Sequence, residues 1–360
     1  MYKYSHGGNI YEPDFSIDKL KADFSANINP LGLPAGVKKA MQNAFSLCVN
    51  YPDAMCRELA AATAAFLDVP AENIFFGNGA ADVLFRLATA LKPKKALLLA
   101  PTFSDYEKAL RTVACEIEYY TLKKENRFEV LEDIIDKITE DIDLVVICNP
   151  NNPTGQLCSQ KILEAVLQKC RDIGAKFLVD ECFMDFVPDE KVFSMKKYLT
   201  AFKELIILKA FTKTYAMPGV RLGYCLTSNS KLHTALHEAG QDWNVSVLAQ
   251  AAGIAALQEE AYLKKSRDLI NKERSFMLKE FSKLGFEPMG EANYIFFHAP
   301  VKLQLPVKLK QAGYLIRSCS NYKGLSDGYY RAAVKSRRDN RNFLKAVKDI
   351  VNDEITIAVD

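Results

Sequence analysis

The stretch LIILKAFTKTYAMPGVRLGY, residues 205–224, decides the fold. It opens with the apolar run Leu205 to Lys209, which is typical of a short buried strand. Lys213 follows this strand, and Arg221 lies eight residues further on in a glycine-bounded turn. A lysine acts as a nucleophile once partial burial frees its amine. This arrangement suits a Schiff base between Lys213 and an aldehyde cofactor, with an anion site at Arg221, although Lys213 taken alone would be a surface residue after a strand.

Two upstream segments repeat this plan of an apolar strand that ends in polar residues. Residues 144–155, LVVICNPNNPTG, pass from an apolar run into turn formers that include Asn152. Residues 177–183, FLVDECF, contain a strand that ends on Asp180. Open α/β sheets collect ligands at such strand ends. A buried carboxylate there can hold a pyridinium nitrogen protonated, as pyridoxal phosphate requires, and Asn152 could donate a hydrogen bond to the ring's phenolate oxygen.

A phosphate site is indicated by residues 73–85, NIFFGNGAADVLF, which read as a strand, a glycine-rich turn and a helix start. Free amides and the helix dipole at such a terminus bind phosphate. The expected ligands are Gly77, Asn78, Gly79 and Ala80, with Thr212 next to the lysine. A single Gly-x-Gly is weak evidence for a phosphate site. The evidence becomes strong because the motif is followed along the chain by the strand-end Asn, the strand-end Asp and then the Thr-Lys pair.

In this order the motifs resemble those of the fold-type I pyridoxal-phosphate enzymes, and among them the histidinol-phosphate aminotransferase-like branch. The resemblance implies an α/β fold-type I PLP-dependent transferase fold, with a mostly parallel sheet in a large domain and a smaller α+β domain. It implies an N-terminal arm over residues 1–40 that contributes to the small domain, a large PLP-binding domain over residues 41–240 and a small C-terminal domain over residues 241–360. Strands alternating with helices agree with such a sheet.

The N-terminal arm narrows the resemblance to the threonine-phosphate decarboxylases of cobalamin biosynthesis. The motif HGGN at residues 6–9 and the segment DFSANINPLG at residues 23–32 carry it, together with IRSCSNY at 316–322 and YYRAAV at 329–334. The implied enzyme is a carboxy-lyase that converts L-threonine O-3-phosphate to (R)-1-amino-2-propanol O-2-phosphate. The residues implied to bind this substrate are His6, Gly7, Asn27, Asn152, Arg317 and Arg331. Arginine suits carboxylate and phosphate alike, so which anion each arginine takes stays open.

The resemblance assigns further roles. Phe103 would stack on the pyridine ring, and Phe183 stands where many relatives carry a tyrosine that bonds the phenolate oxygen. Tyr51 would reach the cofactor phosphate of a neighbouring subunit, which implies a homodimer with shared active sites; the alternative is a packed turn tyrosine. Two positions depart from the family pattern. Ala210 replaces a phosphate-binding Ser or Thr, and Lys335 replaces an arginine.

Three other functions share parts of this pattern. A serine-phosphate decarboxylase that makes ethanolamine phosphate differs only by the absence of one substrate methyl group, worth about 1–3 kcal/mol in an apolar pocket. A histidinol-phosphate-type aminotransferase would use the same lysine and aspartate with a 2-oxo acid acceptor, but the HGGN arm argues against it. A non-catalytic pyridoxal-binding regulator is disfavoured because both of those residues are present.

Composition predicts a soluble cytoplasmic enzyme. The chain of 360 residues is 49% hydrophobic, and its net charge of +3 gives no support to nucleic-acid or membrane binding. The start MYKYSH lacks the apolar core of a signal peptide, and no apolar run approaches the ~20 residues that span a bilayer. The nine cysteines include no C-x-x-C pair, which favours reduced, buried thiols over disulfides or a metal site.

Overall fold

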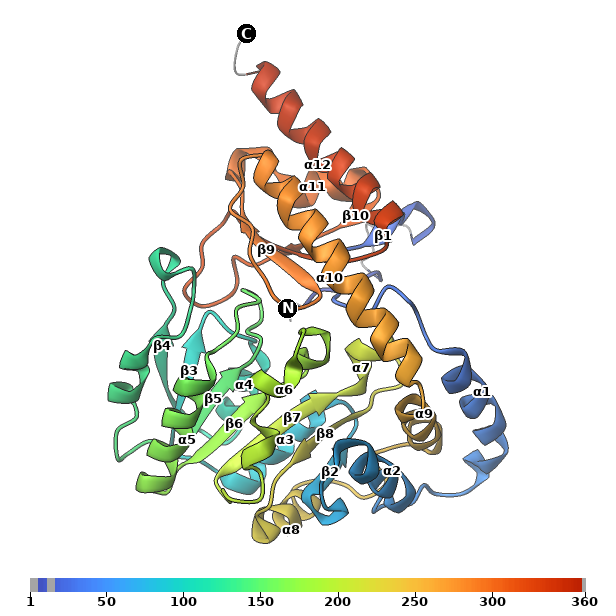
Figure 1. The fold of residues 1–360 in the computed structure, drawn as a ribbon, viewed down its shortest axis with the longest axis vertical. Coiled ribbons are helices and arrows are strands. Elements are labelled where there is room, and N and C mark those ends of the chain that lie inside the picture. Colours follow the sequence, from blue (N-terminus) through green and yellow to red (C-terminus); the bar gives the residue numbers. More distant parts are fainter. Residues whose placement is uncertain (1–5, 12–16, 358–360) are drawn as a thin grey trace.

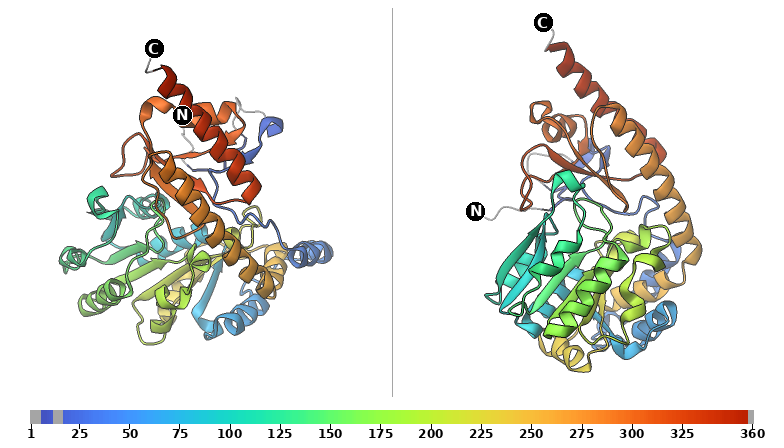
Figure 2. Two further views of the ribbon diagram at one scale, coloured as in Figure 1. Left: turned by 45° about the horizontal axis from the view of Figure 1, so that its top comes forward. Right: turned by 60° about the vertical axis from the view of Figure 1, so that its left-hand side comes forward.

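The computed structural model describes residues 6–11 and 17–357. Figure 1 shows a broad lower part built on one large sheet and a smaller upper part. The long helix α10 (Glu260–Lys283) runs between the two parts, as the views of Figure 2 also show. Within the described residues, no helix has both the length and the apolar character that crossing a bilayer requires.

The large sheet has seven strands in the order β2-β8-β7-β6-β5-β3-β4. All strands are parallel except β8, which runs antiparallel to both neighbours. The strands are β2 (Ile74–Gly77), β3 (Lys95–Ala100), β4 (Glu116–Thr121), β5 (Leu144–Cys148), β6 (Lys176–Asp180), β7 (Leu205–Ala210) and β8 (Gly223–Leu226). This mostly parallel sheet confirms the predicted α/β class.

Helices cover both faces of this sheet, because alternate strand residues enter two separate cores. Val145 and Ile147 of β5 pack in one core with α2 (Arg57–Leu67), α5 (Gln160–Ile173) and α9 (Val247–Leu257). Leu144 and Val146 pack in the other core with α3 (Ala80–Leu91), α4 (Asp105–Arg111) and α8 (Ser230–Glu238). Strands buried on both faces read as continuous apolar runs, which is how they appear in the sequence.

The upper part contains a three-stranded antiparallel sheet in the order β11-β12-β9, formed by β11 (Arg317–Ser318), β12 (Tyr329–Ala333) and β9 (Tyr294–His298). The helices α11 (Leu305–Gln311) and α12 (Arg337–Ile357) belong to it (Figure 1). The N-terminal segment joins this part, because β1 (Ala22–Asp23) pairs in parallel with β10 (Tyr314–Leu315). Helix α9 packs instead on α1 (Ala35–Ala44) and α2. The domain boundaries at residues 40 and 240 stay a prediction.

Two short helices complete the set: α6 (Glu190–Phe193), and α7 (Phe211–Thr214), which follows β7 directly. Register fixes how the neighbouring strand ends meet, since Cys148 pairs with Asp180 and Asp180 pairs with Leu208. The carboxyl ends of β5, β6 and β7 therefore form one edge, and the residues that follow them face the upper part of the molecule.

Candidate active site

A cavity of about 470 Å³ lies where the carboxyl edge of the large sheet meets the N-terminal arm and the upper sheet. Most of the residues expected at the site line it. These are His6, Gly7, Asn27, Ala80, Phe103, Asn152, Asp180, Phe183, Thr212, Lys213, Arg221, Arg317 and Arg331. Gly77, Asn78, Gly79 and Tyr51 do not line it.

Lys213 projects into this cavity from α7, immediately after β7. Burial, aided by the nearby guanidinium groups of Arg331 and Arg221, lowers the pKa of its amine to about 8. A desolvated lysine beside other cations has a large neutral fraction near neutral pH. The Lys213 carbonyl also accepts a hydrogen bond of 3.2 Å from the Asn29 amide, which ties the N-terminal segment to the lysine. The residue thus has the electrostatics that a nucleophilic amine requires.

Asp180 is 5% exposed, and both of its carboxylate oxygens have donors. The Cys182 amide donates to Oδ1 at 2.9 Å, and the Tyr106 hydroxyl donates to Oδ2 at 2.5 Å. Burial raises the pKa of the Asp180 carboxyl, while these two hydrogen bonds favour its ionised form. Sequence reasoning gave Tyr106 no role, although its position three residues after Phe103 on a helix start is a signal that both side chains face one way.

Asn152 and Arg331 orient each other through a hydrogen bond. Arg331 Nη1 donates to Asn152 Oδ1 at 2.5 Å, and Nη2 donates to the Ser25 carbonyl at 2.9 Å. The Tyr322 hydroxyl also donates to Asn152 Oδ1, at 3.4 Å. Because its oxygen is engaged on that side, the Asn152 amide nitrogen is left as the donor for a ligand in the cavity. Arg331 Nε is buried and has no hydrogen-bond partner among the described residues.

The two predicted substrate arginines are direct neighbours across the antiparallel β11–β12 pair, where Arg317 lies opposite Arg331. Arg317 Nη2 donates to Asn321 Oδ1 at 2.8 Å, and its guanidinium lies 5.3 Å from the ring centre of Tyr322. Asn27 also lines this side of the cavity and is 3% exposed. Its Oδ1 has no partner among the described residues. This wall carries two cations and a buried amide without a full set of partners.

The glycine-rich turn lies behind the cavity rather than in its wall. Gly79 has φ +84°, and a Cβ there would lie 2.5 Å from Arg221 Nη2, so only glycine lets the arginine approach. The Asn78 amide donates to Asp82 Oδ2 at 3.0 Å, so this amide already has a partner. Arg221 reaches the cavity, as do Ala80, Ala81 and Leu84 of α3.

The N-terminal arm is folded against the site. A Cβ on Gly7 would lie 2.1 Å from the Ser25 carbonyl oxygen, and the Gly8 amide donates to Ser25 Oγ at 2.8 Å. His6 Nε2 lies 3.0 Å from Asp105 Oδ1, and the His6 ring centre lies 5.6 Å from that of Phe103. The absence of a side chain at Gly7 therefore permits close backbone contact with Ser25.

The remaining predicted positions vary in their distance from the cavity. Phe183 lines it and meets Tyr294 edge-on at 5.1 Å, and Ala210 lines it without any hydroxyl. Lys335 does not line it, and burial lowers the pKa of its amine. Tyr51 is 78% exposed and stacks on Trp243 with ring centres 4.5 Å apart. Tyr51 therefore cannot reach the cavity of its own chain in this conformation.

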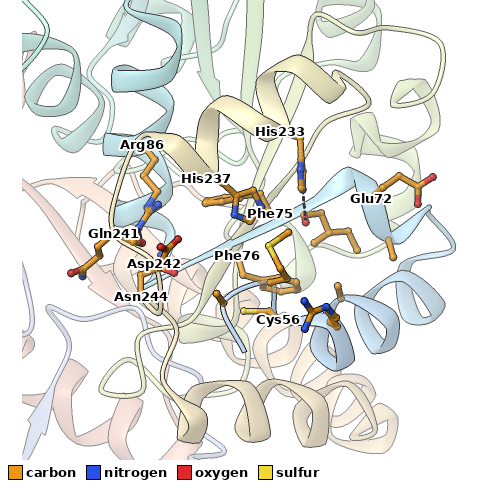
Figure 3. A pocket seen from close by; sticks show the side chains of 16 residues that line it. Cys56, Glu72, Phe75, Phe76, Arg86, His233, His237, Gln241, Asp242 and Asn244 are labelled. Atoms are coloured by element: carbon orange, nitrogen blue, oxygen red, sulfur yellow. Dashed lines mark hydrogen bonds between the residues drawn. The ribbon is translucent and has the colours of Figure 1, made fainter. Parts of the chain in front are cut away.

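A second cavity of about 450 Å³ lies beside the edge strand β2 (Figure 3). Of the charged residues that line it, Arg86 is buried and donates to the Leu236 and Gln241 carbonyls and to Asp82. His233 contacts the Ile74 carbonyl at 3.1 Å. Among the described residues no cluster of three or more His, Cys, Asp or Glu could hold a metal ion. Arg86 and His233 therefore already have partners within the protein.

Comparison with known proteins identifies the family of the chain. The family model for aminotransferase class I and II matches residues 19–347. A threonine-phosphate decarboxylase of Salmonella typhimurium is 34% identical, over 98% of this chain and 98% of its own. A histidinol-phosphate aminotransferase of Moorella thermoacetica is 32% identical, over 91% of this chain and 84% of its own.

A solved structure is also similar along most of its length. The histidinol-phosphate aminotransferase of Clostridium acetobutylicum superposes with a TM-score of 0.86 at 29% identity, covering 92% of this chain and 99% of its own. These findings confirm the fold-type I class and the resemblance to the threonine-phosphate decarboxylases. They leave the role of each individual site residue a prediction.

Proposed function

Because the chain belongs to the aminotransferase class I and II family, whose cofactor is pyridoxal 5′-phosphate, we propose that it decarboxylates L-threonine O-3-phosphate to (R)-1-amino-2-propanol O-2-phosphate. The observation that carries the proposal is the HGGN arm folded into a cavity that also holds two neighbouring arginines. The 34% identity to a threonine-phosphate decarboxylase along nearly the whole chain supports it. The product would serve cobalamin biosynthesis.

The residues of the cavity fit the cofactor. Lys213 offers an amine of lowered pKa, and Asp180 offers a buried carboxylate at the adjacent strand end. Asn152 presents its amide nitrogen, and Thr212, Ala80 and Arg221 would hold the phosphate. The close approach of Arg221 to Gly79 leaves a tight cradle at that end. Ala210 contributes no hydroxyl, so one phosphate hydrogen bond of relatives is lost, worth about 1–3 kcal/mol.

Each residue would then have one task. When bound, the cofactor supplies an electron sink for the pair left at Cα as CO₂ departs. Lys213 Nζ would return a proton to Cα, since its pKa of about 8 lets the amine both hold and release a proton near neutral pH. Asp180 would keep the ring nitrogen protonated through its Oδ atoms. Phe103 would cover one face of the ring and exclude water.

Reaction type would be set by the wall opposite the sheet. Arg331 and Arg317 would fix the substrate carboxylate and phosphate, and His6 and Asn27 would close over the phosphate end. Charge-assisted, bidentate bonds of arginine give both energy and orientation. Holding the bond between Cα and the carboxylate perpendicular to the ring favours loss of CO₂ over loss of the Cα proton.

The test is to incubate purified holoenzyme with L-threonine O-3-phosphate and no 2-oxo acid. We expect stoichiometric release of CO₂ and a phosphorylated aminopropanol, with the cofactor returned unchanged. Conversion of the cofactor to its amine form without CO₂ would instead identify an aminotransferase. That second candidate is favoured by the 32% identity to a histidinol-phosphate aminotransferase. Comparing kcat/KM for threonine and serine phosphates separates the two decarboxylase substrates.

We also propose a homodimer with shared sites. The segment around Tyr51 is exposed and apolar, and Trp243 extends it through the stack on Tyr51. Its exposed members are Phe45, Leu47, Val49, Tyr51, Met55 and Trp243. Contiguous exposed apolar surface of this kind marks an interaction site.

A hybrid experiment tests the shared site. Homodimers of Tyr51→Ala and Lys213→Ala are mixed and exchanged. If Tyr51 serves the partner's cofactor, one site of each hybrid keeps both wild-type residues and activity returns. If Tyr51 serves its own chain, each hybrid site lacks either the tyrosine or the lysine, and no activity returns. If Tyr51 serves no site at all, the Tyr51→Ala parent is already active before mixing. Sedimentation gives the oligomeric state independently.

The cytoplasm is the proposed compartment. Each of the nine cysteines is a free thiol, and only Cys48 is exposed. Burial raises the pKa of the thiols inside the protein, Cys56 and Cys170 among them to about 12, which keeps them protonated and inert. Such thiols support a reducing environment.

A further inference from the structure

Asn29 is a buried residue of the N-terminal segment that contacts the turn carrying Lys213. It is 2% exposed, and it does not line the cavity. Its backbone amide donates to the Lys213 carbonyl at 3.2 Å, and its side-chain Nδ2 donates to the Thr214 carbonyl at 2.7 Å. One residue from a distant part of the sequence therefore binds two consecutive carbonyls at the end of α7.

The helix α7 is too short to fix these carbonyls by itself. It has four residues, and the last carbonyls of any α-helix lack partners within the helix. The Ala216 amide also donates to the Lys213 carbonyl, at the longer distance of 3.4 Å. On the side-chain side, the Thr214 hydroxyl donates to Asp185 Oδ2 at 2.9 Å. The lysine turn is thus held by two separate segments, around Asn29 and around Asp185.

The polar atoms of the Asn29 side chain are all engaged within the protein. Nδ2 also donates to Ser266 Oγ of α10 at 2.7 Å, and Oδ1 accepts from the Leu31 amide at 3.1 Å. Both protons of the amide nitrogen therefore have acceptors, which fixes the orientation of the side chain. Asn27, two residues earlier, differs because its Oδ1 has no partner among the described residues. The first asparagine can thus complete its bonds with a ligand, whereas the second is committed to the lysine turn.

We propose that Asn29 is a positioning residue that holds the Lys213 amine where it returns the proton to Cα. This role rests on the proposed function for the reaction, and on the two carbonyl bonds for the positioning. Proton transfer requires the amine to lie within hydrogen-bond reach of the reacting atom, and a small displacement of a catalytic group is costly in rate. Asn29 therefore acts through the backbone of the lysine turn, without touching the substrate.

The side-chain contact can be removed with a variant that keeps the local turn. In Asn29→Ser the short hydroxyl can still accept from the Leu31 amide, but it cannot reach the Thr214 carbonyl. Ser266→Ala is the matched control, because it removes the bond to α10 and leaves the bond to Thr214. For Asn29→Ser we expect kcat for L-threonine O-3-phosphate to fall about tenfold and KM to change by less than about twofold, since binding groups are untouched. Ser266→Ala should keep both constants within about twofold of wild type. An equal loss of kcat in Ser266→Ala would show that α10, and not the bond to Thr214, places the lysine.

Chemical labelling of the apoprotein gives a readout independent of turnover. Acetic anhydride is added at several pH values, and mass spectrometry follows Lys213 against exposed lysines of the same chain. Burial is the main cause of the lowered pKa of Lys213, about 8, so an amine released toward water should have a pKa closer to 10.5. The midpoint of the Lys213 labelling profile should therefore rise by at least about 0.5 pH in Asn29→Ser and stay unchanged in Ser266→Ala.

The outcomes separate positioning from a role in the fold. Lower thermal stability in Asn29→Ser, with kcat and the labelling midpoint unchanged, would show that Asn29 serves the fold alone and would overturn the proposal. If Asn29→Ser does not fold, Asn29→Asp replaces it, since this variant keeps the size and the acceptor for Leu31 and carries the same expectation for kcat. If wild type releases no CO₂ from threonine phosphate, the proposed function fails, but a raised midpoint in Asn29→Ser would still establish that Asn29 places the lysine.

Discussion

The two walls of the cavity differ in how far their polar groups are already satisfied. On the sheet side, both oxygens of Asp180 and the oxygen of Asn152 have donors. On the side of the arm and the upper sheet, Arg331 Nε and Asn27 Oδ1 are buried without partners among the described residues. Buried polar atoms are seldom left unpaired unless a ligand or water completes them. The sheet wall is thus organised in advance, whereas the opposite wall is completed by what binds there.

The largest expected effect comes from removing the lysine on the sheet side of the cavity. Lys213→Ala should reduce kcat by at least about 10³-fold, because no other amine lines the cavity in the described part of the chain. Steady-state CO₂ release measures this loss. Lys213→Arg is the control for charge, since arginine restores a cation but not a nucleophilic amine. Full activity in Lys213→Ala, or its recovery in Lys213→Arg, would contradict the role of the lysine.

The next largest effect is expected from removing either arginine on the opposite side of the cavity. Arg331→Ala and Arg317→Ala should each lower kcat/KM by roughly 30- to 1,000-fold, equivalent to about 2–4 kcal/mol. The arginine that fixes the carboxylate should also, when removed, raise abortive transamination relative to decarboxylation. Arg337→Ala is the control, because this arginine pairs with Glu273 at 2.9 Å outside the cavity. Thermal destabilisation with normal kinetics in both variants would show that these arginines serve the fold alone.

Both walls were partly predictable from the sequence, for different reasons. The sheet wall carries local signals, because an apolar run that stops at Asp180 or just before Asn152 marks a strand end in any parallel sheet. The roles of Arg317 and Arg331 came from resemblance, and only their cross-strand pairing makes them neighbours. Tyr106 was missed because its partner Asp180 lies far away in the sequence. Strand β4 (Glu116–Thr121) was missed as well, since an edge strand with exposed charges lacks an apolar run.

A stability measurement separates the burial of Lys213 from its chemistry. With its pKa lowered from 10.5 to about 8, the unfolded chain binds more protons than the folded one between these two values. The folded state therefore carries a penalty that is complete below pH 8 and disappears as pH rises toward 10.5. Lys213→Met apoprotein should be more stable than wild type at pH 7, by up to about 3 kcal/mol. Denaturant unfolding at several pH values should show this advantage shrinking as pH rises; a constant advantage would contradict the lowered pKa.

The smallest effect concerns the contact that organises Asp180. The Tyr106 hydroxyl donates to Oδ2 at 2.5 Å from a fully buried position, so Tyr106→Phe removes a hydrogen bond with almost no change in packing. A carboxylate that loses a donor becomes more basic and draws the proton of the ring nitrogen toward itself, which weakens the electron sink. We expect kcat to fall about tenfold while KM changes little, since about 1.4 kcal/mol is a typical value for such a bond.

The control for Tyr106→Phe is Tyr120→Phe, which removes another tyrosine hydroxyl bonded to a carboxylate, that of Asp133, outside the cavity. Nitrogen-15 resonances of labelled cofactor in the holoenzyme report the ring proton directly, and this readout is one that a merely structural role would not move. The resonance should shift toward the unprotonated value in Tyr106→Phe alone. If the resonance stays in place while kcat falls, Tyr106 acts through packing. Asp180 is then held on the sheet side by its hydrogen bond from the Cys182 amide.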